Sequence, residues 1–234
     1  MRLNMEEELF LPSEYKGDVL DFFLSKGWFR ALSYGVMFTT SHLEKEEVQV
    51  PVHWLRYDVS KFHYGSSQRR LLKKNQKEGF KVTFETFRID EELETLFSKY
   101  KELATFTYIT SLEETFASVM DTGVYDTGVL KIRDGEKLIA AGLFDIGNES
   151  IAPILNYYDP DYQSFGLGKL LLMMEIGFSI QNKIQYVYPG YIAPGIDKFN
   201  FKLFPDKKVT EVFIDQDKKW IDYHVWNLIQ LAEK

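Results

Sequence analysis

Residues 150–192 read SIAPILNYYDPDYQSFGLGKLLLMMEIGFSIQNKIQYVYPGYI, and this stretch decides the fold. A strand is predicted over 150–158, an apolar helix over 169–181 and a second strand over 184–188. Small residues in the loop before the helix let the backbone approach an anion closely, and the free N–H groups at a helix start bind phosphate oxygens. The stretch therefore predicts an α/β protein with a candidate anion site at the start of this helix.

The candidate residues of the anion site are Gln163, Gly166, Gly168 and Lys169. A glycine before a helix usually serves as an ordinary turn residue, so the loop by itself is a weak signal for an anion site. Its place between a strand and a helix leaves the anion site and the turn equally open.

The flanking sequence predicts a sheet with helices around it. Asp134-Gly135 and Gly147-Asn148 are turn signals between apolar runs, so a three-stranded meander is predicted over 129–133, 138–145 and 150–158. The other predicted elements are a half-buried strand over 80–84, a helix over 93–104 capped by Asp90, a short helix that opens with Ser111 to Glu114, a strand over 209–214 and a helix over 220–231.

The N-terminal part has a less regular pattern. A helix is predicted over 13–26, and a strand over 48–54, which Pro51 would place at a sheet edge. A further helix begins at Ser66 or Ser67 and ends near Gly79, where the composition changes. We therefore expect an N-terminal region over 1–78, which includes a basic helix over 66–78, and a second domain over 79–234.

Composition excludes several classes of protein. The chain has 234 residues with 28 Lys+Arg against 35 Asp+Glu, and a net charge of −7 argues against a protein that coats nucleic acid through its global charge. The longest apolar run, 170–174, is far below the roughly 20 residues of a membrane span. The charged start over 1–8 does not resemble a signal peptide. The lack of cysteine excludes disulfides, Fe–S clusters and thiolate zinc sites, and it fits a reducing cytoplasm.

The predicted basic helix carries five cations on one side, while Leu71 and Leu72 face the other way. These cations are Arg69, Arg70, Lys73, Lys74 and Lys77. A solvated helix face is the ordinary interpretation of such a run, and it is favoured by the pattern alone. Contact with a phosphate backbone is the alternative, since the rest of the chain is acidic.

Tyrosines mark the ends of both strands in the opening stretch. Tyr157, Tyr158 and Asp159 end the first strand, and Tyr188 and Tyr191 end the second. Ligands of open α/β sheets bind beyond the carboxyl ends of strands, so we expect these side chains to face one cleft. A tyrosine hydroxyl can protonate a leaving group, and its ring can stack on a base. The four histidines have no metal-ligand spacing, so no metal site and no cofactor are predicted.

The order of elements is similar to that of the GNAT acyltransferases, and four segments together resemble the arginyl-tRNA–protein transferase family. These segments are SSQRRLLKKN over 66–75, YDPDY followed by GLGK over 158–169, YVYPGYI over 186–192 and KFNFK over 198–202. The resemblance covers most of the chain from Trp28 to about Asp206. It implies a GNAT-like mixed, mostly antiparallel sheet flanked by helices, and transfer of arginine or leucine from aminoacyl-tRNA to a protein N-terminus, which creates a degradation signal.

On this resemblance, the basic helix together with Lys198 and Lys202 would contact tRNA phosphates. Two features depart from the family: its N-terminal cysteines are missing, and the loop keeps Gln163 and Gly166, which is closer to a CoA-binding loop. The alternatives are therefore an acetyl-CoA-dependent N-acyltransferase and a non-catalytic protein that binds tRNA or N-termini. The sequence leaves open the amino acid transferred, the acceptor and the oligomeric state.

Amide formation from an aminoacyl ester depends mainly on positioning and on stabilising the oxyanion by backbone N–H groups. Asp159 is predicted to orient the incoming ammonium or to accept its proton. Tyr158 or Tyr188 is predicted to protonate the departing ribose hydroxyl.

Overall fold

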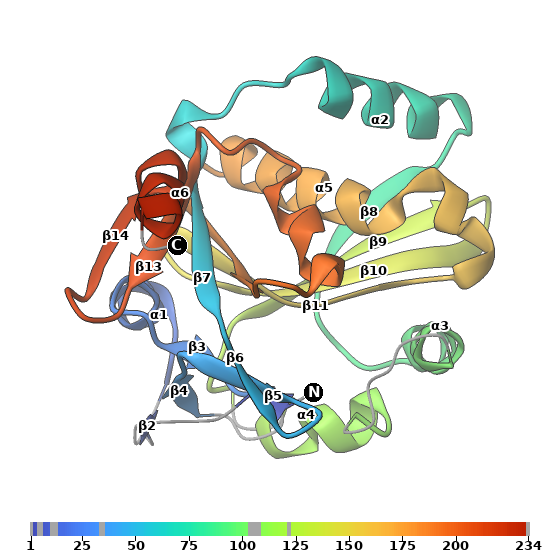
Figure 1. The fold of residues 1–234 in the computed structure, drawn as a ribbon. Coiled ribbons are helices and arrows are strands. Elements are labelled where there is room, and N and C mark those ends of the chain that lie inside the picture. The colour runs from blue at the N-terminus through green and yellow to red at the C-terminus, as the bar shows by residue number, and fades with distance from the viewer. Residues whose placement is uncertain are drawn as a thin grey trace.

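The computed structural model describes residues 2–3, 7–9, 14–32, 36–102, 109–120 and 123–232. Its centre is an eight-stranded sheet with the strand order β14-β13-β7-β12-β11-β10-β9-β8 (Figure 1). The strands are β7 (His53–Asp58), β8 (Lys81–Thr86), β9 (Thr127–Asp134), β10 (Lys137–Ile146), β11 (Ser150–Tyr158), β12 (Tyr186–Ile192), β13 (Thr210–Ile214) and β14 (Lys219–Asp222). Only β11 and β12 pair in parallel within this sheet, and its other neighbours are antiparallel.

Helices cover both faces of the sheet (Figure 1). The apolar helix α5 (Leu167–Gln181) packs on β10, β11 and β12 from one side. Helix α3 (Glu91–Lys101) packs on the opposite side, where α4 (Leu112–Met120) lies against it. The C-terminal α6 (Tyr223–Ala232) lies against β13 and β14. The predicted α/β fold with a mixed, mostly antiparallel sheet is confirmed.

Local signals explain the predicted elements. The turn at Asp134-Gly135 joins β9 to β10, and Gly135 takes the left-handed conformation that favours glycine, with φ +56°. Asp90 accepts a hydrogen bond from the N–H of Leu93 over 2.8 Å and caps α3. The Ser111 hydroxyl accepts the N–H of Glu114 over 3.1 Å in the same way for α4. Residues 103–104 of the predicted helix over 93–104 lie outside the described residues.

Two expectations near the sheet edges were wrong. The helix predicted over 220–231 begins only at Tyr223, because residues 219–222 pair with β13 as β14. Trp220 on this strand packs its ring against Tyr188 and Phe213. Strand β8 is exposed along its length rather than half-buried, since it ends the sheet.

The N-terminal region adds helix α1 (Gly17–Ser25) and two small sheets. One sheet joins β1 (Arg2–Leu3), β5 (His42–Lys45) and β6 (Val48–Pro51), and the other joins β2 (Glu7–Leu9), β4 (Met37–Thr39) and β3 (Phe29–Arg30). The strand predicted over 48–54 is divided. β6 ends at Pro51 and lies at the edge of its small sheet, as Pro51 predicts, whereas β7 lies inside the large sheet between β12 and β13. The large sheet thus includes a strand from before residue 78, and the predicted division into two domains stays a prediction.

Two apolar layers hold the sheet between its helices. Tyr57, Phe144 and Met173 are fully buried between the sheet and α5. Phe97 and Leu143 are fully buried on the α3 side. Each such side chain contributes about 1.5–3 kcal/mol of burial free energy, so the two layers fix the sheet and both helices together. Within the described residues, no helix is both long and apolar enough to cross a membrane.

Candidate functional site

The parallel strands β11 and β12 separate soon after they begin. They pair only at Ser150 with Tyr186 and at Ile151 with Val187, although β11 continues to Tyr158. On its other edge β11 contains a bulge, because its pairing with β10 shifts by one residue at Ile154. A bulge turns backbone groups out of the ladder and is common beside active sites. The separation and the bulge together expose β11 backbone to a ligand in the middle of the sheet.

The glycine loop lies at the end of β11 and starts α5. Gly166 has φ +68°, the left-handed conformation, and it is the N-cap residue of the helix. No side chain in the described part of the chain caps this N-terminus. The N–H groups of Lys169 and Leu170 donate to the main-chain oxygen of Gly166, so those of Leu167 and Gly168 are the candidates for an anion. A Cβ on Gly168 would lie 3.7 Å from the Tyr158 ring, in ordinary contact, and Gln163 and Lys169 are exposed. The predicted anion-site residues thus lie together around one helix start.

The basic helix α2 (Ser66–Lys77) contacts this loop directly. The ammonium of Lys74 donates to the main-chain oxygen of Ser164 over 2.7 Å. The Asn75 amide donates to the main-chain oxygen of Phe165 over 3.2 Å. Two segments that are 90 positions apart in the sequence therefore form one surface around the start of α5.

The cationic face of α2 is exposed. A groove of about 530 Å³ runs along it, lined by Ser66, Arg69, Arg70, Lys73, Lys74, Lys77 and Glu78. In the described part of the chain, no carboxylate forms an ion pair with any of the five cations. Cations that are not neutralised by the protein attract a polyanion, and this attraction extends to the adjacent helix start.

Two polar residues anchor α2, and the sequence reasoning missed both. The buried Gln68 amide donates to the main-chain oxygens of Phe204 and Pro205 over 2.7 and 2.6 Å. Asn75 is buried on the same side and also donates to the Leu71 oxygen over 2.9 Å. Gln68, Leu71, Leu72 and Asn75 have the i, i+3, i+4, i+7 spacing of one helix face, which is the signal that identifies them.

The tyrosines predicted to share one cleft lie on different faces of the sheet. Tyr158 packs with the residues around α5 and lies beside Gly168. Tyr188 is buried on the α3 side, where its hydroxyl accepts a long hydrogen bond of 3.4 Å from Arg56. Burial raises the pKa of Tyr188 to about 12, although Arg56 acts in the opposite direction. Of the two candidate proton donors, only Tyr158 lies at the glycine loop.

The carboxylate of Asp159 forms ion pairs with two lysines. Its buried carboxylate pairs with Lys99 over 2.6 Å and with Lys137 over 2.8 Å, and it accepts the N–H of Asp161. Burial favours a higher pKa, but the hydrogen bonds from Lys137 and Lys99 outweigh it and hold the pKa of Asp159 below its usual value. The role of Asp159 in orienting an ammonium stays a prediction, and these contacts argue against it.

The two lysines of the KFNFK segment differ in their surroundings. Lys198 is exposed on the 3₁₀ segment η3 (Asp197–Leu203). The half-buried Lys202 donates to the main-chain oxygen of Tyr191 over 3.0 Å, and its ammonium lies about 5 Å from the Tyr191 and Phe199 rings. Burial lowers the pKa of Lys202 to about 7, and Lys198 adds to this effect. Contact between these lysines and tRNA phosphates stays a prediction, and Lys202 is held among aromatic rings.

Comparison with known proteins identifies the family of this chain. The family model described as arginine-tRNA-protein transferase, C terminus, matches residues 68–206. The chain belongs to this family. It is 22% identical over 228 residues to the aspartate/glutamate leucyltransferase of Leptospira interrogans, covering 94% of this chain and 85% of the relative. It is 29% identical over 154 residues to the aspartate/glutamate leucyltransferase of Campylobacter jejuni, covering 63% of each.

A solved structure agrees with the predicted fold. The crystal structure of FemX superimposes with a TM-score of 0.50 at 10% identity and covers 91% of this chain and 70% of that one. The predicted GNAT-like fold is confirmed, and the arginine-tRNA-protein transferase family makes the chain an aminoacyltransferase, as its sequence predicted. The family model spans the contact between α2 and the glycine loop, since it includes both segments.

In this member of the arginine-tRNA-protein transferases, a buried carboxyl group lies behind the separated strands. Glu175 on α5 is fully buried next to Asn156 on β11. Gly142 leaves room for both, since a Cβ there would lie 2.7 Å from the Asn156 oxygen and 3.1 Å from a Glu175 oxygen. Burial raises the pKa of Glu175 to about 8, and the Asn156 amide opposes this shift. A lone glutamate in an apolar helix was the sequence signal for it, and the sequence reasoning did not use it.

Metal binding has no visible support in the described residues. No group of three or more histidine, aspartate or glutamate side chains there is arranged to hold an ion. His53, which lies against Trp226, has its pKa lowered to about 4 by burial and by the nearby His42.

Proposed function

We propose that this protein transfers leucine from leucyl-tRNA to the N-terminal α-amine of a protein that begins with aspartate or glutamate. The observation that carries the proposal is the contact between α2 and the glycine loop, seen at Lys74 and Ser164. An aminoacyl-tRNA brings single phosphates near its reactive end and a large polyanionic stem. The open start of α5 suits the former, and the unpaired cations of α2 suit the latter.

The reaction converts an ester to an amide. The neutral α-amine attacks the ester carbonyl, the new C–N bond forms, and the C–O bond to the ribose breaks. An α-amine has a pKa near 7.7–8.0, so a useful fraction is neutral near pH 7 without a strong base. The protein's contribution is to hold both groups in place and to stabilise the oxyanion, and the β11 backbone at the Ile154 bulge, close to where the strands separate, is our candidate source of N–H donors.

The departing ribose oxygen needs a proton. Tyr158 is our candidate donor, because it is half-buried beside Gly168 at the start of α5. Tyr188 is less suited, since its hydroxyl is buried against Arg56 on the other face. The Tyr158→Phe variant should lower kcat and leave the affinity for charged tRNA unchanged, whereas Tyr188→Phe should keep kcat close to that of the parent.

Leucine is proposed as the transferred residue because the named relatives are leucyltransferases that act on aspartate and glutamate. Arginine is the alternative, since the family model carries that name. On the proposed activity, the product would serve as an N-terminal degradation signal, and the protein would act in the cytoplasm, where charged tRNA is found.

An acetyl-CoA-dependent N-acyltransferase is a second candidate. The separation of β11 from β12 and the uncapped helix start also suit a donor with a pyrophosphate and a long arm. A CoA donor would not explain the cationic face of α2, because CoA has no polyanionic stem to bind there. We therefore prefer aminoacyl-tRNA as the donor.

The deciding experiment offers each donor separately. The protein is incubated with leucyl-tRNA, arginyl-tRNA or acetyl-CoA and with peptides that start with Asp, Glu or Ala, and the products are read by mass spectrometry. We expect a mass increase of one leucine on the Asp and Glu peptides only. A mass increase of one arginine would show that arginyl-tRNA, rather than leucyl-tRNA, is the donor. Acetylation without aminoacyl transfer would overturn the proposal.

A further inference from the structure

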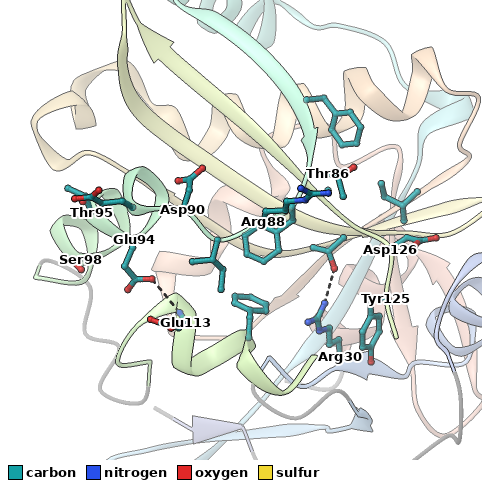
Figure 2. Close-up of a pocket in the computed structure, with 18 residues that line it drawn as sticks. Arg30, Thr86, Arg88, Asp90, Glu94, Thr95, Ser98, Glu113, Tyr125 and Asp126 are labelled. Atoms are coloured by element: carbon teal, nitrogen blue, oxygen red, sulfur yellow. Dashed lines mark hydrogen bonds between the residues drawn. The ribbon is translucent and has the colours of Figure 1, made fainter. Parts of the chain in front are cut away.

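A large cavity lies on the face of the sheet opposite to α5. Its volume is about 1440 Å³, and it is bounded by α3, α4 and the neighbouring ends of β8, β9 and β10. Figure 2 shows Arg30 and Tyr125 side by side at one end, with Asp90 and Glu94 from the α3 region farther along. This cavity contains neither the glycine loop nor α2, so nothing in the donor site accounts for it.

A buried polar cluster forms the end wall of the cavity at Arg30. The guanidinium donates to Asp145 over 2.7 Å and to the Thr127 hydroxyl over 3.2 Å, and both members of the Arg30–Asp145 pair are almost completely buried. The Tyr125 ring lies 4.2 Å from the guanidinium carbon and the Phe116 ring 5.4 Å from it. A guanidinium fixed between two rings and a carboxylate is rigid enough to recognise a ligand.

Three atoms of this cluster have no hydrogen-bond partner within the described residues. They are the Nε of Arg30, the Oδ2 of Asp145 and the hydroxyl oxygen of Tyr125, and all are buried. Native proteins pair nearly all buried polar atoms, because an unpaired one loses its hydration without replacement. Arg30 and Tyr125 line the cavity, whereas the fully buried Asp145 lies behind Arg30 and does not line it. The two lining residues therefore offer a guanidinium N–H and a hydroxyl to an anionic group of a ligand.

The cluster also lies close to the point where β11 and β12 separate. Asp145 on β10 pairs with Ala152 on β11, and Ile151, the preceding residue, makes the last pair with β12. The buried Arg30–Asp145 pair therefore lies one strand away from the start of the separation, at the opposite end of β11 from the glycine loop. A nucleophile held at the cluster would lie on the side of the sheet that the donor leaves free.

The cavity as a whole is acidic. Five carboxylate residues line it, namely Asp90, Glu91, Glu94, Glu113 and Asp126, against the two arginines Arg30 and Arg88. Burial raises the pKa of Asp145, and Arg30 counteracts it. The surrounding field favours an ammonium group, whereas Arg30 provides the buried cation that a single carboxylate can pair with.

We propose that this cavity binds the first residue of the acceptor polypeptide, with Arg30 and Tyr125 holding the acidic side chain and the lining carboxylates holding the α-ammonium. The inference rests on the proposed function and adds the acceptor site to it. An N-terminal aspartate or glutamate presents an ammonium and a carboxylate a few bonds apart, which matches a cavity that combines lining carboxylates with Arg30. An asparagine start has the same shape and lacks the anion, so it leaves Arg30 unmatched.

The test compares two peptides that differ only in Asp or Asn as the first residue. Their affinity for the full-length protein is measured by calorimetry without tRNA, and their transfer kinetics are measured with charged tRNA. Tyr125→Phe removes the unpartnered hydroxyl and keeps the ring that stacks on Arg30. Tyr223→Phe, which changes a buried tyrosine at the start of α6, is the matched control.

Tyr125→Phe should weaken Asp-peptide binding and raise its KM about tenfold, while the KM for charged tRNA and the Tyr223→Phe control stay at parent values. A double variant, Arg30→Gln with Asp145→Asn, removes both buried charges together and should abolish the preference for Asp over Asn. If the double variant fails to fold, the KM and the binding affinity of Tyr125→Phe decide whether the acceptor site is correct.

The outcomes separate this inference from the proposed function. Asp-peptide binding that is lost in Tyr125→Phe supports the acceptor site even if no tRNA supports transfer, and then only the proposed function fails. Aminoacyl transfer with the same KM in the parent and in Tyr125→Phe overturns the acceptor site and leaves the function standing. A parent protein that binds neither peptide, with or without charged tRNA, also overturns it.

Discussion

The ammonium of Lys74 donates a hydrogen bond to the main-chain oxygen of Ser164, 2.7 Å away, and so joins the basic helix to the glycine loop. The two segments are 90 positions apart in the sequence. A basic helix elsewhere on the surface would be an ordinary solvated face. The uncapped start of α5 alone offers a site for one or two phosphates. The cations of the basic helix lie beside it and enlarge this site into a surface that suits a polyanion.

Charge reversal on α2 tests this surface. Arg69→Glu with Lys73→Glu should weaken tRNA binding at least tenfold, because both exposed cations line the groove. Stability should change by only about 0.5 kcal/mol per site, since neither side chain is buried. Affinity is measured by filter binding across a salt series, and the variant should show a shallower salt dependence.

The control for charge reversal is Lys218→Glu with Lys219→Glu. It makes the same number of cation-to-Glu changes, two, on exposed side chains in the β13–β14 turn and at the start of β14, away from α2. Equal tRNA binding by the α2 variant and the parent would mean that the cationic side of the basic helix is an ordinary solvated face.

Gln68 should matter for the placement of α2. Gln68→Met keeps the length of the side chain but leaves the buried oxygens of Phe204 and Pro205 without their donor. We expect a loss of about 1–3 kcal/mol in the free energy of unfolding, the usual effect of unpairing buried polar groups. Gln76→Met, at an exposed position on the same helix, should stay within about 0.5 kcal/mol of the parent in urea denaturation. Equal losses in both would mean that the Gln68 hydrogen bonds do not hold the helix.

Much of the fold was predictable because its signals are local. The meander was identified from the Asp134-Gly135 turn, and α5 was identified from an apolar run of helix length. The β14 strand was missed because a four-residue strand that leads into a helix has no distinct periodicity. Strand β14 forms because it pairs with β13, and this pairing cannot be predicted from the sequence of either segment alone.

The site was predictable only where one segment supplies it. The loop residues Gly166 and Gly168 lie at a helix start, as their sequence indicates. The Arg30–Asp145 pair joins positions 115 residues apart, and neither residue has a local pattern around it. The tyrosines were predicted to face one cleft because both follow strands, but Tyr158 and Tyr188 point to opposite faces of the sheet. Side-chain direction depends on register, which a bulge at Ile154 shifts by one residue.

Titration of the parent and of Gly168 variants with each donor separates the tRNA-dependent from the CoA-dependent enzyme. Gly168→Ala adds a Cβ that has room, 3.7 Å from the nearest atom, and should keep donor binding. Gly168→Asp places a negative charge at the N-terminus of α5, where it favours the helix but repels a phosphate. We expect normal thermal stability and loss of charged-tRNA binding in Gly168→Asp. Low-micromolar acetyl-CoA binding by the parent in calorimetry, abolished by the same variant, would instead establish the CoA-dependent enzyme.

The buried carboxyl group of Glu175 should make stability depend on pH in the direction opposite to most carboxylates. Burial raises its pKa in the folded protein from 4.5 to about 8, so the folded state holds this proton more tightly than the unfolded chain. Its contribution to stability is therefore complete below about pH 4.5 and is lost as pH rises toward 8, at about 1.4 kcal/mol for each unit of pKa difference. Protonated Glu175 can donate to the Asn156 oxygen, which otherwise has no partner in the described structure.

Glu175→Gln retains the shape of the protonated carboxyl group and has no proton to lose. In urea denaturation, this variant should match the parent below about pH 4.5, and it should exceed the parent by a margin that grows up to about pH 8 and then levels off. Glu136→Gln, at an exposed position on the β9–β10 turn, should follow the parent curve throughout. Parallel curves for Glu175→Gln and the parent from pH 5 to pH 9 would show that Glu175 is ionised in the folded protein. A partner for its charge would then have to be present behind the separated strands.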